Sequence, residues 1–145
     1  MVKLTDTVLR SLWEGVILYI IAAVFVDDIS LRETEDAMTR IDLSGVQFST
    51  AVENNFPMVF APHLAILIRS DAQSASSGVL EVVYYRNAEQ IARNVQPLQI
   101  EEGMFAYRLV RAEMEFTEPG TIEAHCRIDQ NEPLIIPYTL KLRQE

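Results

Sequence analysis

Apolar and polar residues alternate most regularly over Thr121–Asp129. Successive side chains of a β-strand point to opposite faces of its sheet, so every second residue shares a face. The apolar residues of this segment share one face, and charged or polar residues occupy the other; the apolar set is Ile122, Ala124, Cys126 and Ile128. The pattern predicts a strand with one buried and one solvated face.

A similar pattern recurs in four other segments of the second half, which are His63–Ser70, Val79–Arg86, Met104–Phe116 and Leu134–Leu142. Turn-forming residues separate these segments, at Asp71–Gly78, Glu118-Pro119-Gly120 and Asp129–Glu132. Pro137 lies within the last segment and has no N–H to donate, which indicates a sheet edge or a bulge. Turn signals every 8 to 12 residues or so are typical of all-β folds. We therefore expect a mostly β chain, folded as an antiparallel β-sandwich or Greek-key barrel of about seven strands.

The longest apolar run is Val16–Val26, which Glu14 and Gly15 precede and Asp27 and Asp28 follow. It is far shorter than the roughly 20 residues that a membrane-spanning helix needs. Its β-branched and aromatic residues favour a strand. The run predicts a strand that is buried on both faces or bends to serve two sheets.

Two segments predict short helices instead. Leu31–Ile41 contains good helix formers and mixed charges. Ala88–Asn94 has a similar composition and fits one or two helical turns that cross between sheets. The expected domain is thus mainly β with one or two short helices.

The stretch from Phe105 to Leu140 has a recurrent order of features. A strand containing Tyr107 leads to Phe116-Thr117-Glu118-Pro119-Gly120, then to an alternating strand, a polar turn and Ile136-Pro137. An opening Leu4–Leu12 segment with a Trp13-Glu14-Gly15 turn precedes the apolar run. This order resembles small bacterial β-sandwich domains, a group with no assigned activity. The resemblance implies a fold and gives no residue a role.

Composition sets limits on partners and location. The chain has 145 residues, 49% hydrophobic and 23% charged, which predicts a single globular domain over 1–145. Its net charge of −9 disfavours nucleic acid, a polyanion, and anionic membrane surfaces. One cysteine, Cys126, rules out an intrachain disulfide and fits a cytoplasmic protein. We see no signal-peptide pattern at the N-terminus.

Candidate chemistry is sparse. His125 lies on the polar face of its strand, and a surface metal site there would need Glu113 or Glu115 of a neighbouring strand as a further ligand. His63, at the start of its segment, has no nearby ligand pattern, and Cys126 lies on an apolar face. The five glycines are isolated, so no phosphate-binding loop forms. We predict no catalytic residue, metal or cofactor.

The pattern therefore favours a non-enzymatic protein-interaction or assembly module, which binds a protein partner or itself. Exposed strand edges and apolar strips serve such contacts. The candidate surface consists of Val83 and Tyr85, with Trp13 and Tyr107. Two alternatives stay open: a small-ligand or carbohydrate-binding domain, and an enzyme whose site is built from distant carboxylates.

Overall fold

The computed structural model describes residues 18–36, 39–71, 76–101 and 105–144. These residues contain twelve strands and no helix. The strands are β1 (Leu18–Val26), β2 (Asp28–Glu33), β3 (Thr39–Ser44), β4 (Ser49–Val52), β5 (Met58–Phe60), β6 (His63–Ser70), β7 (Ser76–Arg86), β8 (Glu89–Ile100), β9 (Phe105–Val110), β10 (Met114–Phe116), β11 (Gly120–Ile128) and β12 (Leu134–Leu142).

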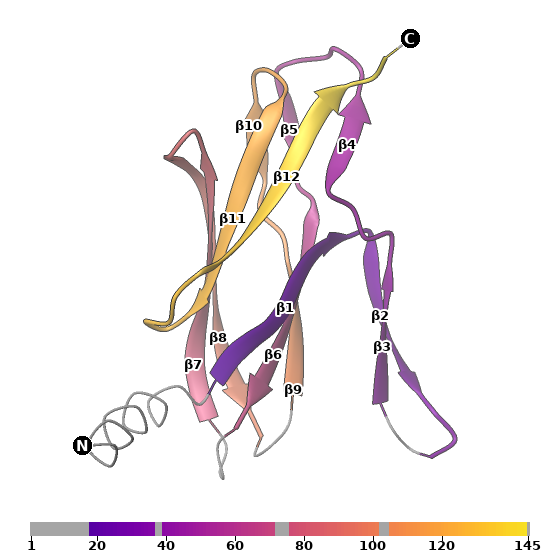
Figure 1. Ribbon diagram of the computed structural model, residues 1–145, viewed down its shortest axis with the longest axis vertical. Helices are drawn as coiled ribbons and strands as arrows, with labels where there is room; N and C mark the ends of the chain where they lie inside the picture. The colour runs from indigo at the N-terminus through magenta and orange to yellow at the C-terminus, as the bar shows by residue number, and fades with distance from the viewer. Residues whose placement is uncertain (1–17, 37–38, 72–75, 102–104, 145) are drawn as a thin grey trace, which may run out of the picture.

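Two larger sheets form the body of the molecule (Figure 1). One has the order β4-β12-β11-β7-β8 and the other the order β1-β6-β9. The short pair β10-β5 continues from the ends of β9 and β6, and β2 pairs with β3 in a separate hairpin. All of these pairings are antiparallel except that of β4 with β12, which is parallel.

Both larger sheets contribute side chains to one hydrophobic core. Strand β11 supplies the alternating residues that the sequence pattern predicts, and Ile122, Ala124 and Cys126 are fully buried. Strand β6 contributes Leu64 and Ile66, also fully buried. Each large apolar side chain buried in this way stabilises the fold by about 1.5–3 kcal/mol, so the period of two fixes which face of each strand turns inward.

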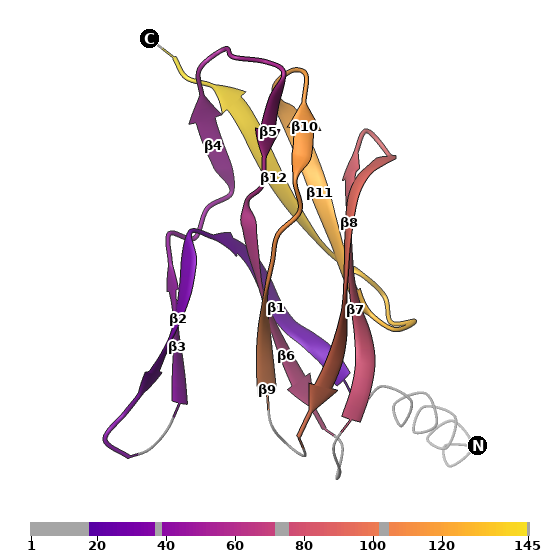
Figure 2. The same cartoon turned by 180° about the vertical axis from the view of Figure 1, so that it is seen from behind.

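The helix predicted over Leu31–Ile41 is wrong. The segment spans most of the β2–β3 hairpin, in which Leu31 pairs with Ile41 across the strands. Ile29 and Leu43 form the neighbouring pair on the same face, and this short alternation outweighs helix propensity. In Figures 1 and 2 the hairpin projects beside the two larger sheets.

The helix predicted over Ala88–Asn94 is also wrong, because β8 occupies this segment. Arg86 pairs with Glu89, so only Asn87 and Ala88 connect β7 to β8. Both have positive φ, 52° and 66°, as a two-residue type I′ turn requires. The sequence conceals this turn because alanine stands where glycine is usual.

The mostly β class is confirmed, whereas the strand count of about seven is too low for the described residues. One reason is that Met104–Phe116 is not a single strand: β9 and β10 pair with different partners. The strand expected within Val16–Val26 is present as β1, and residues 16 and 17 lie outside the described part. Among the described residues, no helix has the length and apolarity to cross a membrane.

Candidate interaction groove and its polar joint

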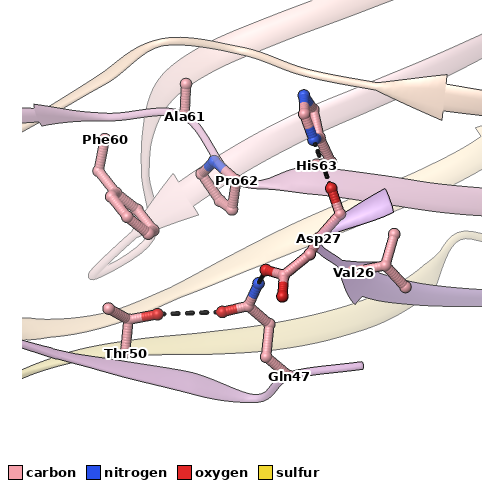
Figure 3. A pocket seen from close by; sticks show the side chains of 8 residues that line it. All are labelled: Val26, Asp27, Gln47, Thr50, Phe60, Ala61, Pro62 and His63. Carbon is pink, nitrogen blue, oxygen red and sulfur yellow. Dashed lines mark hydrogen bonds between the residues drawn. The ribbon is translucent and has the colours of Figure 1, made fainter. Parts of the chain in front are cut away.

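The root of the β2–β3 hairpin lies where β1 ends and β6 begins. A hollow of about 270 Å³ opens there, with Asp27, Gln47 and His63 in its wall (Figure 3). Asp27 is the single residue between β1 and β2, and Gln47 follows β3, so both lie at points where the chain enters or leaves the hairpin. The side chains around this hollow therefore connect the hairpin to the larger sheets.

A hydrogen-bond network, which we call the polar joint, makes this connection through Asp27, Gln47, Thr50 and Tyr138. The Gln47 amide nitrogen donates to Asp27 Oδ1 at 2.8 Å. Gln47 Oε1 accepts hydrogen bonds from the hydroxyls of Tyr138, at 2.8 Å, and Thr50, at 3.0 Å. These two hydroxyls also contact each other. Gln47 thus links the hairpin root to β4 and β12.

The polar joint rests on a group of aromatic rings. Phe25 and Phe60 lie 4.8 Å and 5.6 Å from the Tyr138 ring, measured between centroids. Burial raises the pKa of Tyr138, so its hydroxyl stays protonated and remains a donor to Gln47. The rings fix one end of the network while the hairpin carries the other.

Gly45 allows the close approach of Asp27. Its φ is +67°, and a Cβ at this position would lie 2.1 Å from Asp27 Oδ2. Asp27 N donates to the carbonyls of Ser44 and Gly45, at 2.9 and 3.1 Å. The glycine is therefore required both by its backbone conformation and by the space that the carboxylate occupies.

The imidazole of His63 completes the wall of the hollow. Its Nδ1 lies 3.2 Å from the Asp27 carbonyl oxygen, which accepts a hydrogen bond from the Nδ1–H tautomer. The hydrogen bonds of this wall join Asp27, Gln47, Thr50 and His63 to one another or to Tyr138. The arrangement positions the hairpin root beside β1 and β6.

Between the hairpin and β9 lies a second hollow of about 500 Å³, which we call the β9 groove. Its lining residues are Leu31, Ile41, Phe105, Ala106, Tyr107, Arg108 and Leu109. Leu31 and Phe105 keep 53% and 43% of their surface exposed. Both walls are largely apolar, and each presents large side chains to solvent.

Pairing with β6 determines which residues of β9 face outward. Ala106 and Arg108 pair with the buried Ile68 and Ile66 and share their core-facing side. Phe105, Tyr107 and Leu109 consequently lie on the outer side, toward the groove. The hairpin presents its own alternating face, with Leu31 and Ile41, to the same space.

The structure does not bring the predicted surface residues together. Tyr107 lines the β9 groove, whereas Val83 and Tyr85 lie on β7 in the other large sheet. Val83 is 8% exposed, and the Tyr85 ring packs 4.6 Å from the ring of His125. Trp13 lies outside the described residues. Of the three predicted residues that the structure describes, Tyr107 lines the groove.

Strand pairing does not place His125 beside Glu115. Strand β11 has β7 and β12 as its neighbours, whereas Glu115 lies on β10, which pairs with β5. His125 Nε2 instead lies 3.3 Å from Glu123 Oε1 on its own strand. Among the described residues, no three His, Cys, Asp or Glu side chains are grouped to hold a metal ion.

Cys126 is fully buried in the core. Burial raises the pKa of its thiol to about 12, which keeps it protonated near neutral pH. It packs as a small apolar side chain.

Sequence reasoning missed Leu31, Ile41 and Phe105 as groove residues. A signal was present in the first two, since Ile29 and Leu31 alternate with polar residues, as do Ile41 and Leu43. Each run contains only two apolar residues, and the helix formers between them masked the pattern. No local signal indicates that β9 would lie beside this hairpin.

Comparison with known proteins gives a likeness at the level of fold. No protein-family model matches the chain, and no curated protein is similar to it. Its structure is similar to part of a β-glucosidase, EmGH1 from Erythrobacter marinus, with a TM-score of 0.51 and 13% sequence identity. The match covers 85% of this chain and 15% of the enzyme chain. The described strands therefore resemble a small portion of a much larger protein.

Proposed function

We propose that this chain is a β-sandwich module for protein interaction or assembly, with the β9 groove as its contact surface. The two larger sheets with a shared core support the sandwich description. The observation that carries the function is a projecting two-stranded hairpin whose apolar side faces exposed apolar residues of β9.

An isolated hairpin has marginal stability in water, because two strands bury too little surface. Five of the six residues of β2 are exposed, including Leu31 at 53%. Exposed apolar surface of this kind marks a contact site when it is contiguous. A partner in the groove would bury both Leu31 and Phe105 and would stabilise the hairpin where it stands.

The test compares two variants with the same change of charge. Leu31→Lys places an ammonium group in the groove, whereas Val95→Lys changes a 45% exposed valine on β8, in the other large sheet. Size-exclusion chromatography with light scattering, over a wide concentration range, measures self-association. Retention from native lysate on immobilised protein measures binding to other proteins.

We expect the wild-type chain and Val95→Lys to associate alike, with themselves or with the same retained protein. Leu31→Lys should lose this association while keeping the wild-type far-ultraviolet circular dichroism spectrum. A wild-type chain that is monomeric at every concentration and retains no protein would overturn the proposal. If Leu31→Lys and Val95→Lys associate to the same extent, the contact lies on another surface.

A further inference from the structure

We infer that the β9 groove binds an extended, basic peptide segment, which adds to the free edge of β9 as a further strand. This inference rests on the proposed function and specifies the partner. It is carried by three features of the described residues: the unpaired edge of β9, the apolar walls of the groove, and the charge of the hairpin.

The edge of β9 is open to the groove. In the described part of the chain, β9 pairs with β6 and with no other strand. The groove is lined by consecutive residues of β9, from Phe105 to Leu109, whose side chains point to alternate faces. Core-facing and outward-facing residues of β9 both line this hollow, so it borders the edge of the strand. At that edge, backbone N–H and C=O groups can pair with an added strand.

The walls suit the alternate side chains of an added strand. On one side of such a strand, every second residue would lie beside Phe105 and Tyr107 and beneath Leu31 and Ile41 of the hairpin. Apolar residues at those positions would bury these exposed surfaces. The intervening residues would point away from the apolar walls. The occupant therefore has apolar residues at every second position.

Charge selects a basic peptide over a second copy of the chain. The segment from Asp28 to Ser44 has five acidic and two basic residues. Arg32 and Asp42 pair with each other at 2.8 Å, so the net charge of the segment stays at five acidic minus two basic residues, −3. Two copies, each with a net charge of −9, would repel one another, whereas a cationic segment is attracted.

Arg108 is the one charged residue among those that line the groove. Its guanidinium donates to the carbonyl oxygen of Tyr107 at 2.9 Å. Arg108 lies on the core-facing side of β9 and also lines a hollow beside Gly78 and Pro97 of β7 and β8. Its guanidinium is thus held by the backbone of β9 itself.

The probe is an acetylated and amidated peptide of five Val-Lys repeats with a fluorescent label, and fluorescence anisotropy measures its binding to the full chain. We expect saturable binding that Leu31→Lys weakens at least tenfold and that Val95→Lys leaves within about twofold, as differential burial of one apolar side chain predicts. A peptide of Val-Glu repeats should not bind. Phe105→Lys provides a second groove variant on β9 if Leu31→Lys does not fold.

Backbone pairing has its own control. A strand pairs through the amides of alternate residues, so one peptide is N-methylated at every valine and another at every lysine. We expect one of them to lose binding and the other to retain it. Equal binding by both methylated peptides, or binding that Leu31→Lys leaves unchanged, would overturn the added-strand inference.

The remaining outcomes separate this inference from the proposed function. If Leu31→Lys abolishes self-association of the wild-type chain and no Val-Lys peptide binds, a second copy is the occupant and the peptide inference fails. If Leu31→Lys abolishes retention of a lysate protein and no Val-Lys peptide binds, the groove is a contact surface for a folded partner. In both cases the proposed function stands.

Discussion

At the scale of single residues, Asn87 and Ala88 hold the backbone in the left-handed region. Their φ values of 52° and 66° form the turn between the two longest strands. Asparagine tolerates this region because its short side chain can hydrogen-bond locally, whereas the Cβ of alanine crowds the following carbonyl oxygen. Ala88 therefore carries conformational strain in a turn that is otherwise well suited to its hairpin.

Replacing Ala88 with glycine should relieve that strain. The left-handed conformation disfavours a Cβ by about 1–2 kcal/mol. The greater freedom of glycine in the unfolded chain offsets about 0.4–1 kcal/mol of the gain. We expect Ala88→Gly to raise the free energy of unfolding by about 0.5–1 kcal/mol and Tm by about 2–4 °C, measured by thermal and urea unfolding. Ala88→Val should lower both, and a glycine variant less stable than the wild type would contradict the assigned turn.

At the scale of elements, an ion-pair ladder joins three neighbouring strands of the larger sheet. Glu81 of β7 accepts from Arg93 of β8 at 2.6 Å and pairs with Arg127 of β11 at 3.1 Å. The hydrogen bond from Arg93 is the main cause that holds the pKa of Glu81 below its ordinary value, and the charges of Arg93 and Arg127 add to it. The Glu81 side chain is 17% exposed, so solvent screens the ladder only in part.

The lowered pKa of Glu81 gives the ladder a defined pH dependence. Its stabilisation is complete above the pKa of the unfolded chain and is lost as the pH falls through the lower pKa of the folded chain. We expect Glu81→Gln to cost about 0.5–1 kcal/mol at pH 7 and less than that at pH 3, measured by urea unfolding. Glu115→Gln, at an exposed position of β10, is the control and should leave the free energy of unfolding unchanged at both pH values. A cost for Glu81→Gln that does not shrink in acid would show that packing, not charge, is responsible.

Strands whose apolar residues repeat with a period of two, or form a continuous apolar run as in β1, were predictable, whereas β2, β3 and β8 were not. His63–Ser70 and Leu134–Leu142 coincide with β6 and β12, because several apolar residues in each repeat with a period of two. β2 and β3 contain too few apolar residues for the pattern to outweigh helix propensity, and β8 follows a turn whose Ala88 gives no glycine signal. The break between β9 and β10 depends on tertiary packing, which local sequence does not encode.

At the scale of the whole molecule, the polar joint and the β9 groove form one arrangement. The joint holds the hairpin root, and the hairpin forms one wall of the groove. Among the described residues of the predicted surface, Tyr107 is the one that lines the groove. The rest of the groove depends on the packing of a hairpin against a strand more than 60 residues later in the chain, and that placement has no local signature in the sequence.

The joint therefore predicts how the hairpin responds to loss of Gln47. Gln47→Ala removes the link to Asp27 and leaves the hydroxyls of Thr50 and Tyr138 bonded to each other. The bond to Asp27 is exposed and those to Thr50 and Tyr138 are partly buried, so each lost bond costs about 0.5–1.5 kcal/mol, and the loss is local to the hairpin root. Native-state hydrogen exchange should show faster exchange at hairpin amides, with β11 nearly unchanged.

A matched variant and a second change at the joint make this prediction specific. Gln96→Ala removes a glutamine that donates to Asn94 within β8, and it should leave the hairpin amides unaffected. Gly45→Ala, which would force a Cβ against Asp27, should accelerate exchange in the hairpin as Gln47→Ala does. Uniform acceleration across β11 and the hairpin would mean that the two unfold as one unit. The hairpin wall of the groove would then be as rigid as the two larger sheets. A partner would bind a preformed surface, and substitutions in the polar joint would not change its affinity for the groove.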